Sequence, residues 1–274
     1  MTTLNSYATL AEFKSWKEIT GTDATRDADL EIILENASRH LDDLTGREFY
    51  PRIETRYFSV PESRELRLDA DLLEVITLTN GDGTEISSTQ YYTLPRNRAP
   101  YYALVLKIGS TEAWDINATD GDEYTIGING VWAYHNTYSL AWKSVGTLGA
   151  DIASTTTTTA TMTGGHSVLT SKIYRVDNEI FIPSVVSTNT LTLYGRGMNG
   201  STAATHTSGT TVYEWQPMTE VKKYCLEKGR YDYSRRFGES PAFGATVTGA
   251  GVVLSPRDIG KAEEDLVKHL RRKL

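Results

Sequence analysis

The first clear pattern in this chain is a helical one. Apolar residues recur at steps of three or four positions between residues 30 and 44, which predicts an amphipathic helix with one buried face. Thr25 or Asp23 can cap the start of this helix, and Gly46 suits the left-handed position after its last turn. The stripe consists of Leu30, Ile33, Leu34, Ala37, Leu41 and Leu44.

A shorter helix is predicted just before it. Residues 9–12 read Thr-Leu-Ala-Glu, the capping-box form in which the threonine and the glutamate satisfy backbone amides at a helix start. We expect this helix to bury Leu10, Phe13 and Trp16.

After residue 50 the apolar period changes to two, which predicts β-strands. Residues 80–83 read Asn-Gly-Asp-Gly, a turn signal between two of these strands that favours an antiparallel sheet. The predicted strands cover residues 54–60, 73–79, 91–94, 103–108 and 124–128.

The composition shifts again after residue 145. Residues 146–216 contain seventeen threonines but only three Lys or Arg and four Asp or Glu. We interpret this segment as a small all-β barrel or sandwich inserted into a helical host domain that carries a small antiparallel sheet, residues 1–145 and 217–274. Such an insertion costs little loop-closure entropy at an exposed turn. The predicted fold class is therefore α+β. Strands within the insert are predicted at residues 172–176, 179–183, 190–194 and 211–215.

Residues 217–274 predict two helices separated by a glycine-rich loop at residues 239–254. Pro217 and Thr219 mark the start of the first helix, and Gly238 is placed to end it. Ser255 can cap the second helix, with Pro256 at its first position. The apolar stripe of the second helix is Ile259, Ala262, Leu266 and Leu270.

Charge is distributed unevenly along the chain. Residues 217–274 hold twelve Lys or Arg against eight Asp or Glu, so they carry +4 of a formal net charge of -7, and the other residues carry -11. This acidic balance argues against a general nucleic-acid binder, which needs a basic footprint. The N-terminus lacks a secretory pattern and no run approaches about 18 apolar residues, so we expect a soluble chain with no membrane partner. The single cysteine, Cys225, fits a reducing cytoplasm and is interpreted as a small buried hydrophobe.

Few residues favour catalysis. Gly195, Gly197 and Gly200 match G-x-G-x-x-G after a predicted strand, but no helical stripe follows, so a tight β turn is favoured over phosphate binding. The five histidines lack a metal-ligand spacing, and no G-x-S-x-G nucleophile elbow occurs. We predict no enzymatic activity, cofactor or metal. A hydrolase is the alternative, and it would need clustered carboxylates with perturbed pKa values or a nucleophile activated by histidine.

Two further groups have alternative interpretations. The acidic turn at residues 120–123, with Asp82 and Glu85, could chelate calcium, but it lacks the alternating ligands of a known loop, so a solvated turn is favoured. Trp132, Trp142 and Trp215 are interpreted as core residues of β structure, although aromatic residues also form sugar-binding platforms.

Five short segments form an ordered set, residues 7–13, 41–51, 54–58, 126–134 and 231–237. As a set they resemble the head-tail connector, or head-completion adaptor, proteins of tailed bacteriophages. The resemblance runs over residues 6–134 and 217–274, and residues 146–216 interrupt it. The insert is itself similar to a small β module that recurs in phage virion proteins, through Arg196, Gly197, Asn199, Gly200, Thr202, Ala203, Ala204, His206 and Gly209.

The resemblance implies a ring, usually of twelve subunits, that docks under the portal protein at the head-tail junction of the virion after assembly in the host cytoplasm. Such a ring extends the channel through which double-stranded DNA passes non-specifically, and it presents a platform for a neck, stopper or tail-completion protein. Basic helix ends complement the helix macrodipole, but they also suit a protein partner. The expected partner interface is Arg235, Arg236, Phe243, Lys268, Arg271, Arg272 and Lys273, with the glycine-rich loop ordering on docking. The alternative is a tail or capsid-surface protein that binds glycans or a receptor through exposed aromatic residues near Trp142 and Trp215.

Overall fold

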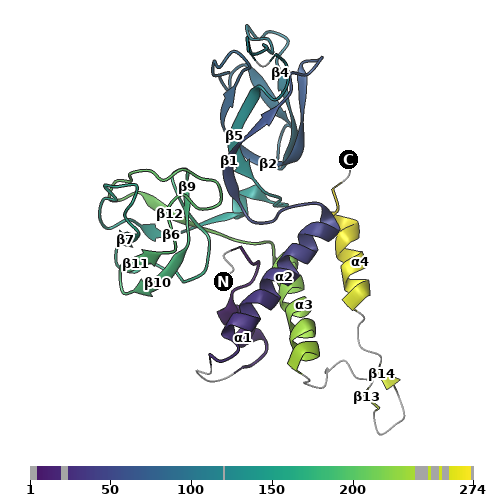
Figure 1. Ribbon diagram of the computed structural model, residues 1–274, viewed down its shortest axis with the longest axis vertical. Coiled ribbons are helices and arrows are strands. Elements are labelled where there is room, and N and C mark those ends of the chain that lie inside the picture. The colour runs from purple at the N-terminus through teal and green to yellow at the C-terminus, as the bar shows by residue number, and fades with distance from the viewer. Residues whose placement is uncertain are drawn as a thin grey trace. The chain divides into compact units, whose positions relative to one another are not determined.

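The computed structural model describes residues 5–19, 24–119, 121–237, 246–247, 253–254 and 259–272, and it shows a mixed α+β chain (Figure 1). The chain divides into two compact units. A helical unit is formed by Met1–Arg47 together with Pro217–Leu274, and a β unit is formed by Glu48–Gln216. The sequence pattern grouped the first sheet with the helices, whereas the structure groups it with the insert.

The described residues form four α-helices and a short 3-10 helix. None of the described helices is long and apolar enough to cross a membrane. The helices are α1 (Leu10–Trp16), α2 (Asp27–Thr45), η1 (Tyr138–Leu140), α3 (Thr219–Phe237) and α4 (Ile259–Leu270).

Helix α1 begins with the predicted capping box. The Thr9 hydroxyl accepts a hydrogen bond from the Glu12 amide, and the Glu12 carboxylate accepts one from the Thr9 amide. Phe13 is fully buried as expected and Leu10 is half-buried, but the prediction for Trp16 is wrong, since 46% of this residue is exposed. Trp16 is the last residue of a seven-residue helix, and no further turn extends the buried face to it.

Helix α2 starts later than its caps predicted. Its N-cap residue is Arg26, which makes no side-chain cap, so the prediction for Thr25 is wrong, while Asp23 lies outside the described residues. Acidic residues in the first turn, Asp27 and Asp29, complement the helix dipole instead. The other end is as predicted, because Gly46 has φ 64° and its amide donates to the Asp42 carbonyl.

Helix α3 packs directly against α2 (Figure 1). The Cys225 sulfur lies 3.3 Å from the Ser38 hydroxyl across this contact. A Cβ added at Gly229 would lie 3.2 Å from side-chain atoms of both Leu34 and Phe13. Glycine at this position therefore allows α3 to approach α1 and α2 closely.

The larger sheet has five antiparallel strands in the order β1-β5-β2-β4-β3. Residues 80–83 form the predicted turn, but β2 and β3 do not pair with each other, because β4 lies between them. Strand β2 is longer than predicted since its first part pairs with β4 and its second part with β5. The strands are β1 (Arg52–Phe58), β2 (Glu65–Thr79), β3 (Tyr91–Leu94), β4 (Tyr101–Leu106) and β5 (Ile126–Trp132).

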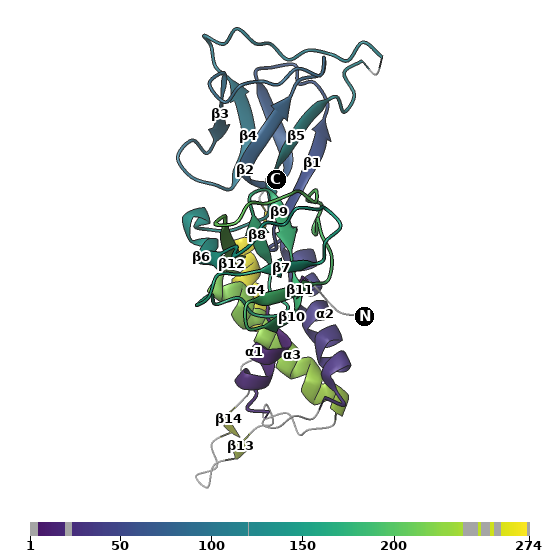
Figure 2. The ribbon, with the colours of Figure 1, turned by 90° about the vertical axis from the view of Figure 1, so that its left-hand side faces the viewer.

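The inserted segment contains a four-stranded sheet, β6-β12-β8-β9, and a three-stranded sheet, β10-β11-β7. The two sheets lie close together (Figure 2) and contribute to one apolar core that includes Val145, Phe181 and Leu191. Neither sheet closes into a barrel, so the barrel prediction is wrong. The strands are β6 (Trp142–Thr147), β7 (Thr159–Thr161), β8 (Tyr174–Val176), β9 (Glu179–Phe181), β10 (Pro183–Ser187), β11 (Thr190–Leu193) and β12 (Thr211–Trp215).

The predicted start of the insert, residue 146, falls inside strand β6. Strand β6 pairs with β12 from Trp142 onward, so it belongs with the two small sheets. We call residues 142–216 the β module.

Candidate functional site

The basic residues predicted as a partner interface lie at two different ends of the helical unit. Arg236, at the end of α3, pairs with Asp29 in the first turn of α2 with an N–O distance of 2.6 Å. The amide of Arg272, just after α4, instead donates to the carbonyl of Thr45 at the end of α2. Asp29 and Thr45 are 16 residues apart on one helix, which corresponds to about 24 Å. The structure therefore does not bring these residues together into one patch.

At the end of α3, cation-aromatic contacts hold the chain against the rest of the helical unit. The Arg26 guanidinium lies 4.5 Å from the centre of the Phe237 ring and donates to the Tyr233 hydroxyl over 2.9 Å. Arg235 and Arg236 are both exposed, but Arg236 pairs with Asp29, whereas the Arg235 guanidinium lies 5.8 Å from the centre of the Tyr231 ring. Arg236 thus has a structural role at this end.

Helix α4 is fixed to the helical unit at two points. The Arg47 side chain donates to the carbonyl of Leu270, which is buried. About two turns earlier, the Glu263 carboxylate accepts a hydrogen bond of 2.9 Å from the Tyr224 hydroxyl. Burial and this bond to a carboxylate raise the pKa of Tyr224, so its hydroxyl stays a donor. These contacts place the residues that follow Glu263 on a fixed helix.

Exposed basic side chains lie at the end of α4. Lys268 and Arg271 are exposed, and neither forms an ion pair with any residue in the described part of the chain. Arg272 is half-buried beside the end of α2. We call Lys268, Arg271 and Arg272 the α4 basic end, and it is the part of the predicted interface that the geometry supports best.

The rest of the predicted interface lies outside the described residues. This applies to Phe243 and Lys273, and to the predicted cap formed by Ser255 and Pro256. Of the glycine-rich loop, the structure describes only a short antiparallel pair, β13 (Thr246–Val247) and β14 (Val253–Leu254).

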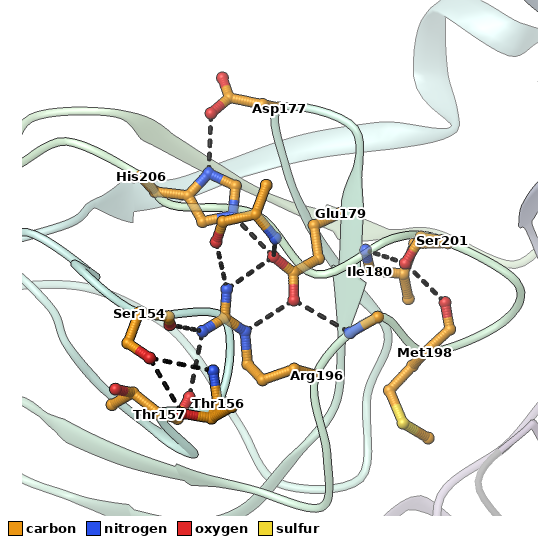
Figure 3. Close-up of polar contacts among 12 residues, drawn as sticks. Ser154, Thr156, Thr157, Asp177, Glu179, Ile180, Arg196, Met198, Ser201 and His206 are labelled. Carbon is orange, nitrogen blue, oxygen red and sulfur yellow. Dashed lines mark hydrogen bonds and ion pairs between the residues drawn. The ribbon is translucent and has the colours of Figure 1, made fainter.

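The G-x-G-x-x-G sequence forms a turn after β11, in agreement with the prediction, and together with the residues that follow it donates hydrogen bonds to the buried carboxylate of Glu179 (Figure 3). The Gly197 amide donates to the Glu179 carboxylate over 3.0 Å, and the Ala204 amide donates to it over 2.9 Å. Arg196 adds two bonds of 2.6 and 2.7 Å. A protein carboxylate therefore occupies the place that a phosphate would need.

The other candidate groups form no metal-binding cluster in the part of the chain that the structure describes. No three His, Cys, Asp or Glu residues gather there in a way that could hold a metal ion, although Asp120 is not described. The Asp82 carboxylate accepts bonds from the amide and hydroxyl of Thr84, which makes it part of a turn. His166 bonds to backbone groups, and His206 bonds to carboxylates.

The tryptophans of the β unit are largely core residues, as predicted. Trp132 is buried, and Trp215 is 3% exposed, with its indole N–H donating to the Phe49 carbonyl. Trp142 is half-buried and lies edge-on to Trp215, with ring centres 5.0 Å apart. The exposed aromatic platform that glycan binding would require is therefore not present at Trp215.

Cys225 is buried as predicted, and we expect it to be unreactive in the folded chain. Burial raises the pKa of its thiol to about 11, so at neutral pH the reactive thiolate is roughly a hundredfold rarer than at an ordinary cysteine. A thiol-specific reagent should therefore modify the folded protein at least about a hundred times more slowly than the protein in denaturant. Comparable rates in the two states would contradict this assignment.

Sequence reasoning did not single out Arg96 and Arg98. Both are exposed on the loop between β3 and β4, and neither forms an ion pair with the described residues. The run Pro-Arg-Asn-Arg-Ala-Pro at residues 95–100 could have predicted that these arginines are exposed, because a loop between two prolines keeps its side chains at the surface.

No protein-family model matches this chain, and neither the curated proteins nor the solved structures with which it was compared gave a match. The resemblance to phage connectors therefore stands on the residues given above.

Proposed function

We propose that this chain is a structural protein of a tailed-phage virion, a head-tail connector that forms a homo-oligomeric ring beneath the portal. In this role the ring extends the DNA channel and offers a docking platform to a neck, stopper or tail-completion protein. The chain acts as an assembly component without catalytic activity.

The observation that carries the proposal is the α4 basic end. Lys268 and Arg271 are exposed and lack ion pairs with the described residues, yet Leu270 between them is buried and hydrogen-bonded through its carbonyl. The exposed cations Lys268 and Arg271 on a fixed helix end suit an acidic protein surface, because the backbone geometry is set before docking and little backbone entropy is lost. The segments that resemble connectors also include α1, the end of α2 and the end of α3, which all belong to the helical unit.

Within this proposal the β module is a two-sheet sandwich on the outside of the ring. Its two sheets share one core, and that core contains no residue of the five-stranded sheet's core cluster. The alternative function, glycan or receptor binding at a tail or capsid surface, is less well supported because Trp215 is buried.

The proposal predicts that replacing Lys268 and Arg271 with serine weakens portal docking. Both side chains are exposed, so the free energy of unfolding should change by less than about 0.5 kcal/mol. Each lost ion pair is worth only about 0.2 to 1 kcal/mol, but a ring repeats the loss on every subunit. Binding to purified portal, measured at low and high salt, should become weaker and less sensitive to salt.

The matched control is Arg96→Ser with Arg98→Ser, which removes the same charge from exposed arginines of the β unit. This control should dock like the parent. Equal loss in both double variants would mean that general charge, and not the α4 basic end, controls docking. Electron microscopy of the protein with and without portal tests the ring itself, and a monomer under both conditions would contradict the proposed function.

A further inference from the structure

Five hydrogen bonds converge on one buried carboxylate in the β module (Figure 3). Glu179 is fully buried at the start of β9, and the chain between β11 and β12 wraps around it. The donors are the Arg196 guanidinium through two nitrogens, the amides of Gly197 and Ala204, and the His206 ring. All of them come from residues 196–206, so one side chain organises the whole segment.

The partners of Glu179 are themselves held in place. Arg196 also donates to the carbonyls of Ser154 and Thr157, which precede β7. The two ring nitrogens of His206 lie 2.8 Å from the carboxylates of Asp177 and Glu179. Both ring nitrogens of His206 therefore face carboxylate oxygens, one of Asp177 and one of Glu179. The segment is therefore tied to the β8–β9 turn as well as to Glu179.

The shape of this segment needs such support. Gly197, Asn199 and Gly200 have φ values of 62°, 51° and 81°, a left-handed region that most residues avoid and that glycine and asparagine can adopt. A Cβ at Gly197 would also lie 2.7 Å from the Ser201 carbonyl oxygen. A free loop of this sequence would populate other conformations, so the bonds to Glu179 select this one.

The same segment contacts the edge strand of the five-stranded sheet. The Ile53 amide donates to the Asn199 carbonyl over 3.0 Å, and the Asn199 side-chain amide donates to the Pro51 carbonyl over 3.1 Å. At Gly200, an added Cβ would meet the Cβ of Glu54 at 3.0 Å. The first contact joins backbone to backbone, the second joins the Asn199 side chain to backbone, and all three require residues 199–200 to be placed accurately.

We propose that Glu179 is a positioning residue that seats the β module on the edge of strand β1. It acts through residues 196–204, whose conformation it fixes and which make the contacts to Pro51, Ile53 and Glu54. The module and the five-stranded sheet have separate cores, so this seat and the ion pair of Arg175 with Glu74 hold them together. The module is then a fixed extension of the sheet, and not a domain on a flexible tether. This inference is independent of the proposed function.

The test is hydrogen exchange on the full chain carrying Glu179→Gln. The Ile53 amide reports on the seat, and the Leu193 amide, which donates to the Thr158 carbonyl, reports on the module itself. We expect exchange at Ile53 to become roughly tenfold faster or more, because several bonds to a charged group are weakened, while Leu193 changes much less. Unchanged exchange at Ile53, or an equal rise at both amides, would overturn the proposal.

The matched control is Glu214→Gln. Glu214, on strand β12, is another buried carboxylate of the module. It forms an ion pair with Lys172, with an N–O distance of 2.8 Å. The control removes a charge of the same kind but leaves residues 196–204 untouched, so exchange at Ile53 should match that of the parent. Faster exchange at Ile53 in this control would show that any loss of charge loosens the seat, which contradicts a specific role for Glu179.

A second variant keeps the proposal testable if Glu179→Gln fails to fold. Gly200→Val adds a side chain against Glu54 at a left-handed position, yet none of the bonds to the Glu179 carboxylate involves Gly200. Exchange at Ile53 should rise while the Ala204 amide, which donates to Glu179, stays protected. If Ile53 keeps the protection of the parent, residues 199–200 do not form the seat and the proposal is wrong.

Discussion

Adding one methyl group at Gly130 is expected to destabilise the β unit by about 3 kcal/mol. In Gly130→Ala the new Cβ would lie 2.5 Å from the carbonyl oxygen of Glu74 and 2.6 Å from a methyl group of Leu72. Both residues belong to β2, which pairs with β5 at this point, so the clash cannot be relieved without shifting a central strand pair. Chemical denaturation of the variant and the parent measures the loss.

The same strand supplies the control for this prediction. At Gly127 an added Cβ would come no closer than 3.4 Å to the Tyr57 ring, which is an ordinary contact. Gly127→Ala should therefore change the free energy of unfolding by less than about 1 kcal/mol, with a gain possible because alanine loses less backbone entropy on folding. If both variants lose the same stability, close approach of β2 is not the reason for glycine at position 130.

The helices could be predicted because their signals are local. The apolar stripe of α2, the capping box at Thr9 and the left-handed Gly46 each involve residues within one or two turns. The predictions failed where burial or a helix start depends on residues outside the local pattern. Whether Trp16 is covered depends on what packs against the last turn of α1, and the start of α2 is stabilised by acidic side chains in its first turn instead of by a cap at Thr25.

The β unit was harder to predict because its pairings are non-local. Strand pattern located β3 and β12, but the alternation of Leu66 and Leu68 early in β2 becomes a strand signal only once β4 is known to pair with it. The start of the β module was misplaced for the same reason, since Trp142 joins it by pairing with Trp215.

For the charged groups at the candidate sites, too, local features could be predicted and non-local pairings could not. The sequence could place Lys268 and Arg271 at a helix end, but not the ion pair of Arg236 with Asp29, which joins residues that lie far apart in the chain. The sequence around Glu179 could have predicted a buried, paired carboxylate, but our sequence analysis did not use it. It stands directly before the apolar residues 180–183, within a segment that has only seven charged side chains, and a carboxylate that is buried in such a place must find a partner inside.

Replacing Arg196 with methionine is expected to lower the free energy of unfolding by about 3 to 5 kcal/mol at neutral pH. The Arg196 side chain is 5% exposed and Glu179 is fully buried, so the variant leaves a buried carboxylate without its main cation. The control is Arg67→Met, which breaks the exposed pair of Arg67 with Glu65 and should cost less than about 1 kcal/mol.

The loss in Arg196→Met should depend on pH, and the direction follows from the Glu179 carboxyl. Burial alone would raise its pKa above the ordinary 4.5, but the bonds from Arg196, Ala204, His206 and Gly197 outweigh burial and lower the pKa to about 2. A group with a lowered pKa in the folded state stabilises the protein fully above its ordinary pKa, and this contribution is lost as the pH falls towards 2. The stability difference between the parent and Arg196→Met should therefore be largest above pH 4.5 and should shrink as the pH falls towards 2. A difference that stays constant over this range would mean that Arg196 stabilises the module by packing, and that its charge is not what holds the Glu179 carboxylate.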